Sequence, residues 1–108
     1  MKRGEVWLVA FGPTVGGEIQ KQRPAVIVSN DSSNKYLNRL QVVPLTSAVD
    51  RLYPSEAPVV FRGKKHKATA DQLTTVSKTR LVNRAGRLSP TDLHGVEQAI
   101  RVQLGLVP

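Results

Sequence analysis

The alternation of apolar and polar residues predicts several short strands over the first three quarters of the chain. The predicted strands cover residues 5–11, 24–29, 40–46, 57–61, 67–70 and 73–78. The near-continuous apolar run at 24–29 is typical of a strand that is covered on both faces, and Pro44 indicates an edge or a bulge in the next strand. The segments at 57–61 and 67–70 flank a basic turn at Gly63 and are predicted to pair as a hairpin, whereas residues 30–34 are predicted to form a loop.

The pattern changes to a helical one near the C-terminus. Ser89 is a suitable N-cap, Pro90 suits the first helical position, and Asp92 can meet free backbone N–H groups. The apolar positions of the predicted stripe are Leu93, Val96, Ala99, Ile100 and Leu104, and Gly105 follows as a stop. Short strands at close spacing favour a small barrel or a strongly curled sheet. The predicted fold is therefore α+β, mainly β: a compact barrel with one C-terminal α-helix.

Length and composition narrow the class of protein. The chain has 108 residues, which predicts a single domain over 1–108, and no cysteine, which excludes disulfides and thiolate chemistry. We see neither the layout of a signal peptide nor an apolar run long enough for a membrane span, so we expect a soluble, cytoplasmic protein with no membrane partner. Sixteen Lys and Arg against eight Asp and Glu give a net charge of +8. Nucleic acid is therefore the leading partner class, although basic proteins can simply be well solvated.

The sequence offers little for a metal or a cofactor. Its two histidines are His66, inside the basic stretch at 62–67, and His94, on the polar side of the predicted helix. A loop residue and a solvated residue are the favoured interpretations, although His66 could touch phosphate. No ligand spacing or phosphate-binding glycine motif is found, so we expect neither a metal nor a cofactor.

Polar residues instead gather at the ends of the predicted strands, where scaffolds often carry function. They are Glu18, Gln20 and Arg23 before the second strand, Ser29, Asn30 and Asp31 after it, Thr46 and Ser47 after the third, and Asp71 and Gln72 between two later ones. Each also has an ordinary structural interpretation, such as turn formation by Asn30 and Asp71.

Such a set could cleave RNA, because the 2′-hydroxyl supplies the nucleophile and no metal is required. The reaction needs a base, an acid and positive charge on the phosphate. The fork of an arginine matches two phosphate oxygens, but an arginine is a poor base. Arg23 is therefore assigned to charge stabilisation, with proton donation to the leaving oxygen. Glu18 is the more natural base, and Thr46 a positioning hydroxyl.

Five segments taken in order resemble the MazF/PemK (Kid) family of toxin endoribonucleases. They are RGEVW (3–7), GGEIQKQRPAVIVSND (16–31), VVPLTS (42–47), ADQLTTVSKTRL (70–81) and AIRVQLGL (99–106). The resemblance implies an SH3-like barrel, a homodimer, and metal-independent cleavage of single-stranded RNA at short sequences to 2′,3′-cyclic phosphate and 5′-hydroxyl ends. It also implies a cognate antitoxin of a type II toxin–antitoxin system, with an acidic tail that blocks the site.

Residue by residue, the resemblance places the family's catalytic arginine, threonine and glutamate at Arg23, Thr46 and Glu18. Thr69 stands where the Kid branch has a catalytic arginine, so the role of Asp71 is left between catalysis and loop structure. The residues that we expect to contact the substrate are Gln20, Asn30, Ser47, Lys64, Lys65 and Asp71.

Two alternatives stay open at this point. Gyrase poisons are toxins of the same fold that bind a protein and cut nothing, although the positive charge suits a protein partner poorly. A plain RNA-binding barrel would explain the charge, but five aromatic residues provide few stacking platforms for single-stranded bases.

Overall fold

The structure, a computed structural model, describes residues 1–12 and 22–106. The strands are β1 (Glu5–Ala10), β2 (Gln22–Ile27), β3 (Arg39–Thr46), β4 (Glu56–Phe61), β5 (Lys64–Thr69), β6 (Thr74–Ser77) and β7 (Leu81–Arg87). The helices are α1 (Asp31–Tyr36) and α2 (Pro90–Leu104), with single 3₁₀ turns η1 (Ala70–Gln72) and η2 (Lys78–Arg80). No helix within these ranges is long and apolar enough to cross a membrane.

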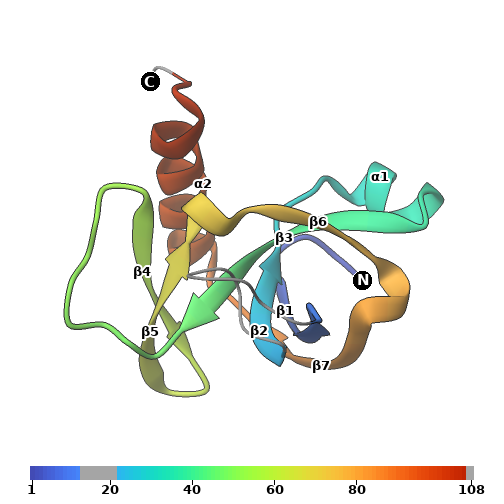
Figure 1. Ribbon diagram of the computed structural model, residues 1–108, viewed down its shortest axis with the longest axis horizontal. Helices are drawn as coiled ribbons and strands as arrows, with labels where there is room; N and C mark the ends of the chain where they lie inside the picture. The colour runs from blue at the N-terminus through green and yellow to red at the C-terminus, as the bar shows by residue number, and fades with distance from the viewer. Residues whose placement is uncertain (13–21, 107–108) are drawn as a thin grey trace.

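The strands form one curled antiparallel sheet in the order β4-β5-β3-β2-β1-β7, with β6 paired to β3 (Figure 1). Strand β3 organises the sheet because it pairs with three others. Residues Arg39 to Val42 pair with β6, the central part pairs with β2, and Leu45 and Thr46 pair with β5. The prediction of a mainly-β barrel with a C-terminal helix is confirmed.

Two apolar clusters fill the two faces of this sheet. The larger cluster lies under α2 and joins Val26, Val43, Leu45 and Val59 to Val96 and other buried side chains. The smaller cluster contains Val9, Ala25, Ile27, Leu40, Val42, Val76 and Leu81. Because side chains alternate along a strand, the second cluster lies on the opposite face of β2 and β3, which we call the outer face. Strand β2 is therefore covered on both faces, as predicted.

The hairpin of β4 and β5 is confirmed, but β5 begins earlier than predicted. Phe61 pairs with Lys64, which leaves Arg62 and Gly63 as a two-residue turn with φ of 51° and 75°. Positive φ at both positions is the mark of a type I′ turn, whose twist matches that of the strands. His66 therefore lies in a strand and not in the turn, and its ring packs edge-on against Phe61 at 5.3 Å between ring centroids.

Residues 30–34 do not form the predicted loop. The Asn30 side chain accepts a hydrogen bond from the Ser33 amide at 2.8 Å and caps α1. Asn34 is buried and donates to the Ser29 carbonyl at 2.9 Å. The Asn and Asp side chains that were expected to form a loop therefore start a helix of six residues. This helix has no apolar stripe.

Helix α2 begins and ends as predicted. The Ser89 hydroxyl accepts from the Asp92 amide at 3.1 Å, and Gly105 adopts the left-handed conformation at φ 69°. Val96 and Ala99 are buried, but Leu104 is 55% exposed. Figure 1 shows why: the C-terminal end of α2 projects beyond the sheet, so the predicted apolar stripe has nothing to cover at its last position.

Candidate active site

Arg23 lies near the start of β2, close to Thr46, the candidate catalytic residue at the end of β3. Its Nη1 donates a hydrogen bond to the Leu45 carbonyl at 3.3 Å, and the side chain is half-buried. Ala25 pairs with Pro44 in the antiparallel register of β2 and β3. Continuing that register by two residues places Arg23 opposite Thr46 on the same face of the sheet.

Thr46 ends β3 and starts the β3–β4 loop, residues 47–55. Its Oγ1 accepts a hydrogen bond from the Ala48 amide at 3.2 Å. On the side away from β2, Thr46 pairs with Lys67 of β5. Arg23, Thr46 and Lys67 therefore form a row across three strands, with about 4.8 Å between neighbouring strands. We call it the cross-strand row. Within it the Arg23 guanidinium and the Thr46 hydroxyl are suited to binding a phosphate, whereas the Lys67 ammonium is paired with Glu56.

Lys67 is the member of the row that sequence reasoning missed. The residue is only 9% exposed, and its Nζ lies 2.9 Å from Glu56 Oε1 and 2.7 Å from the Arg51 carbonyl oxygen. The ammonium also lies 5.9 Å from the centre of the Tyr53 ring. Alternation within the predicted strand gives the direction of this side chain, but not the loop that covers it.

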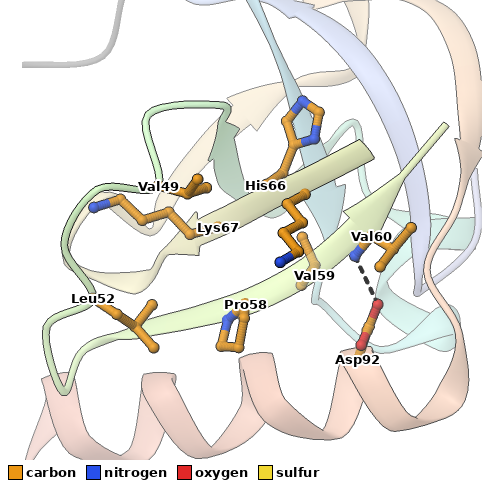
Figure 2. Close-up of a pocket in the computed structure, with 9 residues that line it drawn as sticks. Val49, Leu52, Pro58, Val59, Val60, His66, Lys67 and Asp92 are labelled. Atoms are coloured by element: carbon orange, nitrogen blue, oxygen red, sulfur yellow. Dashed lines mark hydrogen bonds between the residues drawn. The ribbon is translucent and has the colours of Figure 1, made fainter. Parts of the chain in front are cut away.

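A hollow of about 480 Å³ lies beside Lys67 of the cross-strand row, between the β3–β4 loop, the β4–β5 hairpin and the first turn of α2. Figure 2 shows Val49 and Leu52 of the loop and Pro58 of β4 around it. The same view shows the bond from the Val60 amide to Asp92 Oδ2, at 2.9 Å, which ties strand β4 to α2. The hollow combines apolar walls with the side chains of Lys65 and Lys67.

The basic stretch at 62–67 is not one continuous phosphate-binding surface. Arg62 donates to the Ala85 carbonyl at 3.2 Å, and Lys67 is held by Glu56. Lys64 and Lys65 are exposed. Because they are adjacent in a strand, they point to opposite faces, and Lys65 shares the outer face with Lys67.

The other predicted site residues lie in different parts of the molecule. Ser47 is exposed and directly follows Thr46 at the start of the β3–β4 loop. Asn30 lies beyond the opposite end of β2 from Arg23, where it caps α1. Asp71 is exposed in η1, just after β5. Glu18 and Gln20 lie outside the described residues.

Thr69, at the place of the Kid-branch arginine, is buried and donates its hydroxyl to the Pro44 carbonyl at 3.1 Å. This side chain stabilises the contact between β5 and β3. Among residues 1–12 and 22–106, no group of three or more metal-ligating side chains is found.

Two acidic groups are tied into the structure around β1. The Arg3 amide donates to Asp31 at 2.7 Å and lowers the pKa of that carboxyl. Burial raises the pKa of Glu5, but bonds from the Lys2 amide and the Trp7 indole, together with the charges of the N-terminus and Arg84, outweigh burial and lower the pKa overall.

Comparison with known proteins places this geometry in a family. Residues 2–104 match the family described as PemK-like, MazF-like toxin of type II toxin-antitoxin system. The endoribonuclease MazF9 of Mycobacterium tuberculosis is 36% identical over 115 residues, covering 98% of each chain.

Solved structures agree on the fold. A mycobacterial endoribonuclease in complex with its cognate antitoxin superimposes with a TM-score of 0.84 at 24% identity, covering 100% of this chain and 98% of the other. MazF from Deinococcus radiodurans gives a TM-score of 0.85 at 23% identity, covering 98% and 97%. The assignment made from the sequence is confirmed: the chain belongs to the PemK-like, MazF-like toxins of type II toxin–antitoxin systems.

Proposed function

We propose that this toxin is a metal-independent, sequence-specific endoribonuclease that cleaves single-stranded RNA. The observation that carries the proposal is the hydrogen bond from Arg23 to the Leu45 carbonyl, because it holds the guanidinium beside Thr46 on one face of the sheet. The family membership and the name of the 36% identical relative support the same activity.

In the proposed reaction the 2′-hydroxyl attacks the adjacent phosphorus and the bond to the 5′-oxygen breaks. The products are a 2′,3′-cyclic phosphate and a 5′-hydroxyl. Glu18 accepts the proton of the 2′-hydroxyl, and Thr46 positions the phosphate. Arg23 stabilises the charge on the phosphate oxygens and gives a proton to the leaving 5′-oxygen, and exchange with solvent returns that proton to the guanidinium. The residues proposed to contact the flanking RNA are Gln20, Asn30, Ser47, Lys64, Lys65 and Asp71.

The proposal extends to the partners. The whole chain, residues 1–108, acts as one toxin domain in the cytoplasm, and a cognate antitoxin with an acidic tail covers the basic site. A mycobacterial endoribonuclease forms a complex with its cognate antitoxin, which supports an antitoxin as a partner. We also propose a homodimer, because Val102, Leu104 and Leu106 at the free end of α2 are each more than half exposed.

The direct test is incubation of the purified protein with a mixed-sequence RNA in EDTA. We expect discrete fragments with cyclic-phosphate ends, and no cut at a site whose 2′-hydroxyl has been removed. Arg23→Ala should lower the rate by at least about 100-fold, the loss typical when one transition-state donor is removed. Lys35→Met, a charge-matched change in α1, serves as the control and should cleave normally.

Two outcomes would overturn the proposal. Cutting of an all-DNA strand would exclude attack by a 2′-hydroxyl. Intact RNA in the presence of a folded, monodisperse protein would favour the protein-binding alternative, and capture of gyrase from a lysate would identify that target. A large fall in melting temperature in Arg23→Ala would indicate that the arginine is structural.

A further inference from the structure

We propose that Lys67 is a positioning residue for RNA cleavage, because its buried ion pair with Glu56 fixes the β3–β4 loop beside Thr46. The fixed loop forms the outer wall of the hollow that takes the RNA next to the scissile phosphate. The RNA part of this inference rests on the proposed function, whereas the anchoring of the loop does not.

The anchor consists of a small set of bonds at the end of the loop. Lys67 Nζ donates to Glu56 Oε1 at 2.9 Å and to the Arg51 carbonyl at 2.7 Å. The same Glu56 Oε1 accepts from the Tyr53 amide at 2.9 Å, and the Glu56 amide donates to the Tyr53 carbonyl at 2.9 Å. Lys67 and Glu56 side chains are 11% and 10% exposed, so this is a nearly buried pair that grips the backbone at two loop residues.

The other end of the loop is fixed at the cross-strand row. Thr46 Oγ1 accepts from the Ala48 amide, and Thr46 is the register partner of Lys67. The loop therefore leaves the sheet at Thr46 and returns to a lysine that lies one strand away from it. The anchor therefore lies one strand spacing from the proposed reaction centre.

Stability alone does not explain the buried ion pair of Lys67 and Glu56. A buried ion pair is often no more stabilising than apolar residues of the same size. The neighbouring walls of the hollow, Val49, Leu52 and Pro58, are apolar and would accept such a replacement. What apolar residues cannot do is bond the Arg51 carbonyl and the Tyr53 amide, so the charged pair specifies the path of the loop.

The loop also carries groups that an RNA strand would meet. Ser47 and Arg51 are exposed on it, and Lys65 lies across the hollow on the outer face. These groups bind parts of the RNA that do not react. Loss of these contacts should therefore weaken the binding of the substrate and of the transition state equally, which raises KM and leaves kcat largely unchanged.

The first experiment measures the loop without RNA, as the rate of tryptic cleavage after Arg51 in the native protein, followed by mass spectrometry. We expect trypsin to cut the Lys67→Met variant at least about 10-fold faster than the wild type, because local opening governs proteolysis. The double variant Lys67→Met/Glu56→Met leaves no unpaired buried charge and should keep the melting temperature while showing the same acceleration. Trypsin should cut the Lys35→Met variant after Arg51 at the wild-type rate. Unchanged cleavage in the double variant would overturn the anchor.

The second experiment measures cleavage kinetics on a single-site RNA oligonucleotide. The double variant should raise KM by about 10-fold with kcat within about 3-fold, and Lys67→Arg, which keeps the cation, should recover most of the affinity. The double variant could have a loop that trypsin cuts faster and still have the wild-type KM. That result would show that the ion pair orders the loop but that the loop does not serve RNA binding. If the wild-type protein cuts no RNA at all, the proposed function fails, and the proteolysis result still decides the anchoring.

Discussion

At the scale of single residues, three arginines are held by main-chain carbonyls. Arg23 donates to the Leu45 carbonyl, Arg80 to the Ala10 carbonyl at 3.0 Å, and Arg62 to the Ala85 carbonyl. A guanidinium fixed by one of its N–H groups keeps others free for a ligand. Arg23 is therefore positioned by the sheet and still able to bind phosphate.

Glu5 provides a test of such charges through pH. Its lowered pKa means that the unfolded chain binds more protons than the native state between that pKa and the ordinary glutamate value of about 4.3. The stabilisation by Glu5 is therefore complete above the ordinary value and is lost as the pH falls through the lowered pKa. We expect Glu5→Gln to cost about 1 to 2 kcal/mol at pH 7.

The measurement is urea unfolding of both proteins from pH 7 to pH 3. The difference in unfolding free energy should be constant down to about pH 4.3 and should narrow below it. A difference that stays the same down to pH 3 would mean that Glu5 acts through its shape and not through its charge.

Arg23 and Thr46 could be found in the sequence because each stands where an apolar run meets polar residues. Lys67 could not, because it appeared as one more cation in a basic stretch. Its burial depends on the register of β5 against β3 and on a loop that returns over it, and neither is encoded in the local pattern. Asn30, which the sequence placed in a loop, caps α1, and its predicted contact with RNA stays a prediction.

At the scale of elements, two glycines show how the same substitution can have opposite effects. Gly63 needs φ 75° for the hairpin turn, and no atom lies within 4 Å of the position that a Cβ would take, so the cost of a side chain is purely conformational. Gly63→Ala should destabilise by about 1 to 2 kcal/mol. Gly95 lies inside α2, and a Cβ there would meet Ala57 at an ordinary 3.9 Å. Gly95→Ala should stabilise by about 0.5 to 1 kcal/mol.

Chemical unfolding of the two variants beside the wild type checks both signs. Destabilisation by Gly95→Ala would show that the contact between α2 and β4 is tighter than its geometry indicates. A neutral Gly63→Ala would mean that the turn can change its type without loss.

The elements that the sequence predicted correctly have strong local signals. Helix α2 has a cap, a stripe and a glycine stop, and the hairpin has a glycine turn directly after the apolar part of β4. Strand β7 was not predicted because Val82, Asn83 and Arg84 are exposed and give no alternation. Its place is set by pairing with β1, which contains two register irregularities, and long-range pairing of this kind has no signature within seven residues.

At the scale of the whole molecule, two opposed forces act on the proposed homodimer. The net charge of +8 makes two copies repel each other, and salt screens that repulsion. The apolar side chains at the free end of α2 favour association, because their contact removes surface from water. Salt should therefore strengthen the dimer, whereas it should weaken RNA binding, in which phosphates release bound counterions.

The last prediction separates these forces by sedimentation velocity and RNA titration at 50 and 300 mM salt. We expect the wild-type dimer to tighten with salt while RNA affinity falls by at least about 10-fold. Leu104→Glu should give a monomer at micromolar concentration, because the substitution puts a charge into an apolar contact. Tyr36→Glu, at a 76% exposed residue of α1, should leave the dimer intact. A Leu104→Glu variant that still dimerises would place the interface on another surface, and equal salt trends for the dimer and for RNA would mean that charge governs both associations.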